Sequence, residues 1–325
     1  MDFRLPLTPK PFTDKIRHRD KLFLIGSCFT EQIGQKLAAH KFRVMDNPHG
    51  ILFNPVSISR SLRSYIKPDL LTKQDLFEHN ELWGSWEHHT RFSHPDPHIV
   101  LDRINHSQVS ANEFLAEADW ALLTLGSAFV YERQGQVVAN CHKVPTDKFN
   151  KRLLSVQETV QVLRDAIQSL QAFNKGIKCI FTISPVRHLR DGFVENNRSK
   201  ATLILAVEEL IASMTDCFYF PAYELVIDDL RDYRFYAEDM VHPNYAATNY
   251  VWEKFLEACV DEADRKLMKE IADIRSAANH KPFHPTSNAH RAFLASSRDK
   301  LIKLKEQYPY IDFEEELAIF DKQAT

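Results

Sequence analysis

Two short segments, far apart in the chain, carry residue types that can share a proton. Near the start, Gly26-Ser27-Cys28 places a hydroxyl and a thiol directly after an apolar run. Near the end, Asp239 and His242 stand three residues apart, just before Pro243. A nucleophile in one segment and an acid–base pair in the other would suit nucleophilic acyl transfer.

The first segment lies where a strand is expected to pass into a helix. Backbone N–H groups at a helix start are unpaired, so they can stabilise a thiolate or an oxyanion, with help from the helix dipole. A nucleophile there would be exposed and activated, and we expect the helix start to depress the pKa of Cys28. The alternative is structural: Ser27 caps the helix and Cys28 packs inside.

In the second segment, His242 can act as a general base because the pKa of histidine is close to neutrality. A nearby carboxylate, Asp239, would fix its tautomer and stabilise the imidazolium. Pro243 suits the first position of a helix. The alternative is a capping aspartate beside a surface histidine.

Buried strands and helices alternate along the chain. Apolar runs predict strands at 22–25, 42–45, 120–125, 178–183, 217–220 and 224–227. Helical spacing predicts helices at 29–40, 55–65, 155–173, 197–214 and 245–262. We expect hairpins at 82–92 and 128–143, the second turning at Gln134-Gly135, in an otherwise irregular region 67–115.

This pattern indicates an α/β protein with a three-layer α/β/α, flavodoxin-like fold around a parallel sheet. Ligands bind at the carboxyl ends of the strands in such sheets. The polar motifs lie at those predicted ends, at 26–28, 46–50, 126–127, 184–188 and 239–242. Their common placement predicts one active site at this edge.

The expected organisation is an α/β hydrolase-type domain at 1–262, with an insert at about 67–115, and a helical C-terminal extension at 263–325. The extension is charged, and its sequence predicts helices at 264–278, 287–307 and 312–320. We expect these helices to pack on the core or to serve in a homo-oligomer.

These motifs resemble those of a known family. Residues 22–30 look like the first block of the SGNH (GDSL-type) hydrolases, and 26–29 match the signature of the GSCFA family, with Thr30 where that family has alanine. Residues 239–244 resemble the last SGNH block, Asp-x-x-His-Pro. The likeness to GSCFA proteins runs over roughly 1–320. It implies an esterase or acyltransferase of the SGNH-hydrolase fold, with a covalent acyl-enzyme and no cofactor.

The resemblance implies site residues as well. A gap-free alignment on Gly-Asp-Ser-Leu places Cys28 at the nucleophile position, with Ser27 as the alternative. Residues 47–50 and 124–127 are similar in place to the second and third blocks, so the N–H groups of Gly50 and Gly126 are expected oxyanion donors.

The third block departs from the SGNH pattern, because Ala128 stands where an asparagine supplies the usual oxyanion donor. Candidates to replace that donor are Asn54, Asn140 or a histidine of the insert. The departure also favours a rival function, a non-catalytic ligand-binding protein on the same fold.

Further polar residues near these motifs are candidates for substrate binding. His88 and His89 are expected in a wall or lid over the site. Arg187 and His188 follow a strand end, where they could bind a carboxylate or phosphate. Asn140 and His142 are expected at the mouth. A metal-dependent hydrolase using the insert is a further alternative, although adjacent histidines on a strand face opposite sides, so no metal site is predicted.

The bulk composition narrows the function classes. The formal net charge is -3, with no basic surplus for nucleic acid. No run approaches a membrane span, and the first residues lack a signal-peptide core, so we expect a cytoplasmic protein. The five dispersed cysteines predict no disulfide framework. The eight glycines include no phosphate-binding loop. The expected substrate is a small-molecule or carbohydrate ester, with no membrane or nucleic-acid partner.

Overall fold

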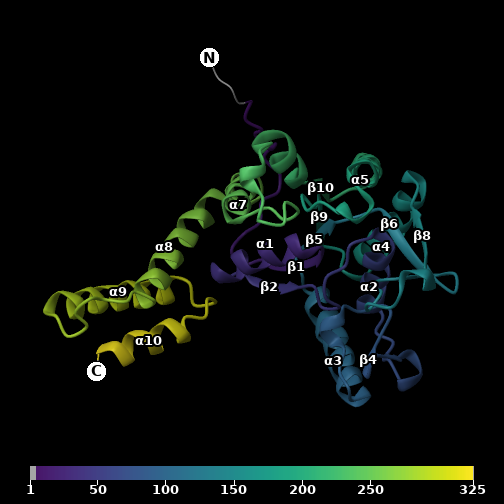
Figure 1. Ribbon diagram of the computed structural model, residues 1–325. Helices are drawn as coiled ribbons and strands as arrows, with labels where there is room; N and C mark the ends of the chain where they lie inside the picture. Colours follow the sequence, from purple (N-terminus) through teal and green to yellow (C-terminus); the bar gives the residue numbers. More distant parts are fainter. Residues whose placement is uncertain (1–4, 325) are drawn as a thin grey trace.

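A computed structural model describes residues 5–324. Its core is one parallel sheet of five strands, in the order β10-β9-β5-β1-β2. This is the expected three-layer α/β/α architecture with flavodoxin-like strand order (Figure 1). The strands are β1 (Lys21–Gly26), β2 (Arg43–Asp46), β5 (Trp120–Leu125), β9 (Lys178–Ile183) and β10 (Cys217–Tyr219).

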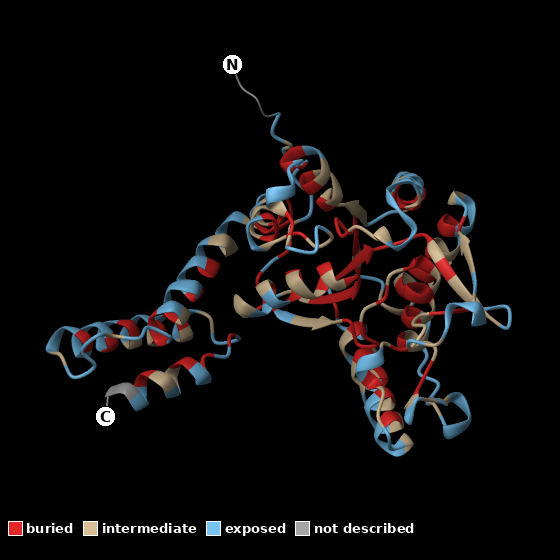
Figure 2. Cartoon of the chain, in the orientation of Figure 1, coloured by how far each residue is buried: buried red, intermediate tan, exposed pale blue. Residues whose placement is uncertain are grey.

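Alternate residues of the strands face opposite layers. In β1, Phe23 and Ile25 join the core under α2 (Pro55–Ile66), α3 (Pro97–Ala116), α4 (Val156–Phe173) and α5 (Phe193–Ser213). Leu22 and Leu24 join the core under α1 (Cys28–Ala39) and α7 (Tyr245–Cys259). Both faces of the sheet are therefore covered, which explains the continuous apolar runs in its strands. Figure 2 shows this burial along the sheet and the inner helix faces.

The expected irregular region 67–115 is more regular than its sequence indicated. Its hairpin joins β3 (Phe77–His79) to β4 (Leu82–Gly84), and the rest of the expected hairpin, 85–92, is a loop ending in the 3-10 turn η2 (Thr90–Phe92). The helix α3 was missed because polar residues separate its buried stripe. That stripe is Val100, Ile104, Gln108, Ala111 and Leu115.

A second expectation was wrong at 224–227. These residues belong to the short helix α6 (Ala222–Glu224) and the π-helical segment η5 (Leu225–Leu230). Leu225 and Val226 are buried in the core beside α7, so the apolar run marks burial but not strand geometry. Periodicity alone cannot separate a short buried strand from a short buried helix.

The second expected hairpin is confirmed, with β6 (Phe129–Arg133) and β7 (Gln136–Val138) on either side of Gln134-Gly135. A third strand, β8 (Asn150–Leu153), pairs with β6 and was not foreseen. The remaining 3-10 turns are short. They are η1 (Lys73–Asp75), η3 (Thr146–Lys148), η4 (Leu189–Asp191) and η6 (Tyr233–Phe235).

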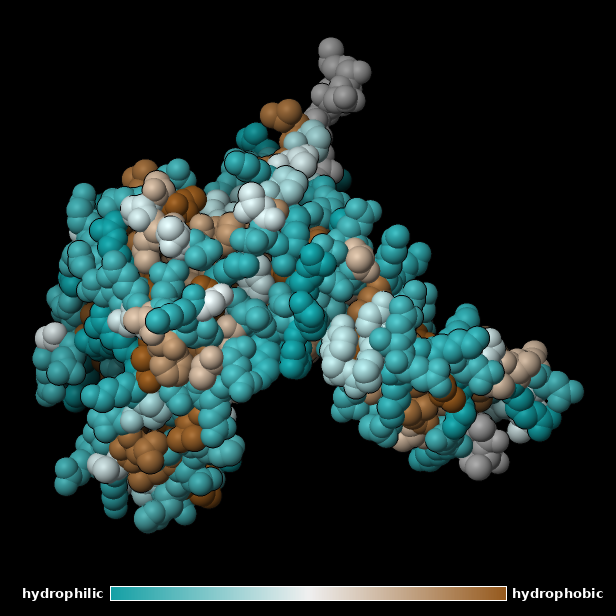
Figure 3. Space-filling model, turned by 180° about the vertical axis from the view of Figure 1, so that it is seen from behind, coloured by the Kyte–Doolittle hydropathy of each residue, from teal (hydrophilic) through white to brown (hydrophobic). Residues whose placement is uncertain are grey.

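The helices α8 (Glu262–Ala278), α9 (Asn288–Gln307) and α10 (Glu314–Ala324) form a separate apolar cluster beyond the sheet (Figure 1). A buried carboxylate joins them to the main domain, because Glu316 lies 2.9 Å from the Lys41 ammonium. The reverse face is mainly hydrophilic, with hydrophobic side chains gathered over the α3 lobe and this tail (Figure 3). Within residues 5–324, no helix has the length and apolar character required to cross a bilayer.

Candidate active site

The turn from β1 into α1 depends on a glycine. Gly26 has φ of +143°, and a Cβ there would lie 2.2 Å from the Thr124 carbonyl oxygen of the neighbouring strand. Asn47, after β2, accepts a 2.7 Å hydrogen bond from the Gly26 N–H through its Oδ1. The Ser27 N–H donates to the Thr124 carbonyl. The turn is thus held by both neighbouring strands before the helix begins.

Ser27 and Cys28 have different roles in this turn. Ser27 is fully buried and is the N-cap of α1, with its Oγ accepting a 3.3 Å hydrogen bond from the Phe29 N–H. Cys28 is the first residue of the helix and is partly exposed. The structural alternative therefore holds for Ser27, whereas the Cys28 thiol is the more accessible of the two groups.

The expectation that the helix start depresses the Cys28 pKa is wrong in direction. Burial raises the pKa of this thiol, because the surroundings disfavour the thiolate. Hydrogen bonds from the backbone N–H groups of Phe29 and Cys28 oppose this rise, as does the charge of Lys200, while Glu31 adds to it. Cys28 is therefore a neutral thiol near pH 7 and needs a base to become a nucleophile.

Asp239 and His242 are in direct contact, as their spacing of three residues predicted. The His242 Nδ1 lies 2.7 Å from the Asp239 Oδ2, and the Asp239 Oδ1 accepts the N–H groups of Val241 and His242 at 2.9 and 3.0 Å. These hydrogen bonds, led by the His242 backbone N–H, lower the pKa of Asp239 to about 2. The ionised carboxylate accepts the Nδ1 proton, which leaves Nε2 free to act as a base.

One backbone hydrogen bond links this pair to the carboxyl edge of the sheet. The Arg187 N–H, after β9, donates a 3.2 Å hydrogen bond to the Val241 carbonyl. The next residue, His188, has a pKa lowered to about 4 by burial and by the charges of Lys200 and His242. The 239–242 turn thus lies beside the exit of β9. Lys200, whose charge lowers the pKa of His188, also acts on the pKa of Cys28.

Lys200 is a buried cation that the sequence reasoning missed. Its Nζ donates hydrogen bonds of 2.7 Å to the carbonyls of Gly126 and Ser184, which follow β5 and β9. Burial lowers its pKa to about 7, and the negative charge of the Cys28 thiolate, where that thiolate forms, opposes the shift. The sequence feature that could have indicated Lys200 is its position in the buried stripe of α5, with Asn196 and Leu203. A lysine is unusual in such a stripe.

The expected glycine oxyanion donors do not fit this arrangement. The Gly50 N–H donates to the Asn47 carbonyl at 2.7 Å, and the Gly126 N–H donates to the Phe53 carbonyl at 2.8 Å. Gly50 has φ of +85° and lies against the His89 Cβ, so it allows close approach of the insert. Asn54 caps α2 through Oδ1, and its Nδ2 makes no hydrogen bond to a described residue. Asn54 is buried, with an exposed fraction of 5%.

The predicted substrate-binding residues fall into two places. Arg187 stacks on Tyr236, with 4.0 Å from the guanidinium carbon to the ring centre, beside His188 at the strand edge. His142 instead holds the insert together, with its Nε2 lying 2.9 Å from the Ser85 carbonyl oxygen. Asn140 accepts the His142 N–H.

The two adjacent histidines of the insert, His88 and His89, lie in different environments. His88 is buried against His49, whereas His89 accepts the Arg91 N–H and lies over Gly50. Within residues 5–324, no group of three or more His, Cys, Asp or Glu side chains is placed to hold a metal ion.

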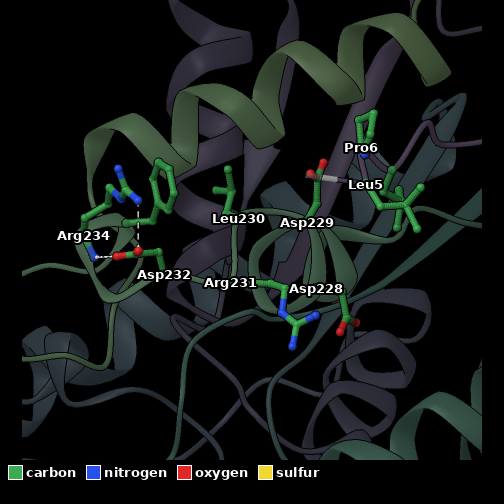
Figure 4. A pocket seen from close by; sticks show the side chains of 10 residues that line it. Leu5, Pro6, Asp228, Asp229, Leu230, Arg231, Asp232 and Arg234 are labelled. Carbon is green, nitrogen blue, oxygen red and sulfur yellow. Dashed lines mark hydrogen bonds and ion pairs between the residues drawn. The ribbon is translucent and has the colours of Figure 1, made fainter. Parts of the chain in front are cut away.

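A large hollow of the described surface lies elsewhere. It measures about 1250 Å³ and lies between the N-terminal segment at Leu5 and residues 228–235 (Figure 4). Its described lining residues include Asp228, Asp229 and Asp232 but no cysteine, serine or histidine. The volume of this hollow therefore does not lead to the Cys28 thiol or to the Asp239–His242 pair.

The fold and this arrangement define a three-layer α/β protein with a thiol and an Asp–His pair at the carboxyl edge of its sheet. A model of the GSCFA family matches residues 21–255, and a model of the GSCFA domain protein, C-terminal domain, matches residues 271–325. The chain belongs to the GSCFA family.

Comparison with other proteins adds little to this membership. No curated protein matches the sequence. Among solved structures, one match is a carbohydrate esterase family 3 protein from Talaromyces cellulolyticus. The two share 9% sequence identity with a TM-score of 0.36, over 78% of this chain and 99% of that chain.

Proposed function

We propose that the protein is an acyl-ester hydrolase or acyltransferase in which Cys28 is the nucleophile, His242 the general base and Asp239 its orienting carboxylate. The observation that carries this proposal is the 2.7 Å contact between Asp239 Oδ2 and His242 Nδ1. This contact leaves the His242 Nε2 unoccupied on a turn beside the exit of β9, and Cys28 begins α1 at the carboxyl end of β1 in the same parallel sheet. A small or carbohydrate-linked ester is the proposed substrate class.

The reaction follows from these groups. The His242 Nε2 takes the thiol proton as the Cys28 sulfur attacks the ester carbonyl, which forms a tetrahedral oxyanion. The imidazolium then gives its proton to the leaving alcohol, and an acyl-thioester on Cys28 remains. Water or an acceptor alcohol, deprotonated by His242, attacks this thioester and restores the thiol. The raised pKa of Cys28 makes the base necessary at the first step.

The oxyanion needs hydrogen-bond donors other than the two glycines. Ala128, where the SGNH pattern has asparagine, is fully buried, and its N–H donates to the Ser199 Oγ at 2.7 Å. We assign the donor role to Asn54 Nδ2 and to the Cys28 backbone N–H, because the next N–H of α1, that of Phe29, already donates to the Ser27 Oγ. Loss of one such donor typically costs about 3–4 kcal/mol of transition-state stabilisation.

The test is hydrolysis of a short-chain p-nitrophenyl ester and of an acyl-thioester. The variants Cys28→Ala and His242→Ala should each lower kcat by about 10³-fold or more, because both groups act in one proton transfer. Cys141→Ala is the matched control, since Cys141 is also a partly exposed thiol. Full activity in both site variants would refute the assignment.

A non-catalytic ligand-binding protein is the second candidate function. It is favoured by the raised Cys28 pKa and by the buried Ala128 in place of a donor. Peptide-resolved labelling separates the two. The enzyme predicts that Cys28 reacts with iodoacetamide faster than Cys141 does and that His242→Ala slows it, whereas a binding protein predicts equal, slow labelling.

A further inference from the structure

Two cysteines of the central sheet stand directly beside each other. Cys179 of β9 and Cys217 of β10 are partners in the register of these two parallel strands (Figure 1). The Cys179 N–H also donates a 2.8 Å hydrogen bond to the carbonyl of Asp216, the residue before Cys217. Neighbouring strands lie about 4.8 Å apart, which is within the range of Cα–Cα separations that a disulfide spans. The backbone therefore holds the two residues close enough for a disulfide.

Both cysteine side chains point to the same face of the sheet. Cys179 and Cys217 pack in the core under α2, α3, α4 and α5, whereas the residues that follow them, Ile180 and Phe218, pack in the core under α1 and α7. Successive side chains of a strand alternate between the two faces, so this division places both thiols on one side. The two thiols are free, and they form a hydrogen bond with each other.

The two thiols differ in exposure. Cys179 has an exposed fraction of 0%, whereas Cys217 is partly exposed. Cys217 is the first residue of β10, which is an edge strand of the sheet, and it follows Asp216, whose φ is +56°. The end of an edge strand opens more readily than the interior of a sheet. Cys217 can therefore shift toward Cys179 while the central strands keep their register.

The hydrogen bond between the thiols makes Cys217 the more reactive of the two. It lowers the pKa of Cys217, although burial and the charge of Asp216 both oppose this. The same hydrogen bond, together with burial, raises the pKa of Cys179 well above its usual range. The thiolate is the species that reacts with oxidants. The partly exposed Cys217 is therefore expected to react first, with Cys179 beside it as the second thiol.

We propose that Cys179 and Cys217 are a site of reversible oxidation, at which hydrogen peroxide links β9 to β10 through a disulfide. The Cys217 thiolate attacks one peroxide oxygen, so that an S–O bond forms and the O–O bond breaks. The departing hydroxide takes a proton from solvent and becomes water. The Cys179 sulfur then attacks the sulfur of the Cys217 sulfenic acid, an S–S bond forms, and hydroxide leaves with the Cys179 proton as a second water.

Electrons balance in both directions of this chemistry. The two thiols lose two electrons together, and hydrogen peroxide gains them. Two molecules of a small thiol, such as glutathione, reverse the oxidation by thiol–disulfide exchange and become a disulfide themselves. The assignment is independent of the acyl-transfer proposal, because it requires neither Cys28 nor His242.

The experiment is peptide mapping of the full chain after the folded, reduced protein has been treated with hydrogen peroxide. Remaining thiols are blocked with N-ethylmaleimide, and the protein is digested with trypsin without reduction. Cleavage after lysine and arginine gives the peptides 179–187 and 201–231, each with one of the two cysteines. A species with the mass of these two peptides joined by a disulfide should appear in the wild type and disappear after treatment with dithiothreitol.

Four variants assign the roles of the thiols. Cys217→Ser should abolish the cross-link. Cys179→Ser should leave Cys217 as a sulfenic acid that dimedone traps, because the second thiol is missing. Cys141→Ser and Cys28→Ala are the matched controls, since each removes another partly exposed thiol and should retain the cross-link. Thermal unfolding of each variant reports whether it is folded.

Two results would overturn the proposal. One is the absence of the linked peptides from the oxidised wild type, or their formation only when peroxide is added in urea. The other is a main product in which Cys179 or Cys217 is joined to a different cysteine, because the sheet would then not hold the two thiols together.

Discussion

The buried Lys200 ammonium should make the stability of the protein depend on pH in a distinctive way. Its pKa is lowered from 10.5 to about 7, chiefly by burial. This shift of about 3.5 pH units corresponds to about 5 kcal/mol of penalty on the charged folded form, at about 1.4 kcal/mol for each unit. The penalty is fully present below pH 7.

The sign follows from proton binding. Between pH 7 and 10.5 the unfolded chain keeps the Lys200 proton while the folded chain has lost it. Unfolding therefore takes up a proton, so the free energy of unfolding rises with pH across this window and levels off above it. Lys200→Met removes this contribution. It also leaves the Gly126 and Ser184 carbonyls without the ammonium donor, at about 1–3 kcal/mol each.

The assay is urea unfolding of the wild type and Lys200→Met at intervals from pH 6 to pH 10. Near pH 6 the relief of the charge penalty offsets the lost hydrogen bonds, so the two proteins should be similarly stable. By pH 10 the wild type should have gained several kcal/mol over the variant. Lys175→Met, at an exposed lysine, is the control and should follow the wild type. Wild-type and Lys200→Met curves that stay parallel within about 1 kcal/mol would refute the buried, titrating lysine.

Three further predictions concern the candidate site. Asp239→Asn should lower kcat by about 10⁴-fold, because an amide no longer fixes the His242 tautomer. Since the pKa of Asp239 is lowered to about 2, the rate of the wild type should show no step from the titration of Asp239 above about pH 4. Gly26→Ala should cost about 3–5 kcal/mol in urea unfolding, since the new Cβ meets the Thr124 carbonyl at a positive φ, and a loss under 1 kcal/mol would contradict that geometry. Ser27→Ala should cost about 1 kcal/mol of stability as a lost N-cap while retaining ester turnover, and abolished turnover in a folded protein would return the nucleophile role to Ser27.

The sequence alone determined the features that depend on local chemistry. Buried strands show as continuous apolar runs because both faces of the sheet are covered, and helix spacing follows from one turn per 3.6 residues. The Asp239–His242 contact could be anticipated because it closes within a single turn. The glycine at 26 was marked by the abrupt end of an apolar run.

Which polar atoms are buried, paired or unpaired depends on how distant segments pack in the folded protein. Burial of Ser27, with Cys28 left partly exposed, is set by how α1 packs on the sheet. The Gly126 N–H is taken by Phe53 from another loop, and Lys200 reaches two strand ends from a distant helix. Desolvation and hydrogen-bond competition depend on neighbours far away in the chain, so residue type and spacing could place these groups near the site but could not determine their pKa values or partners.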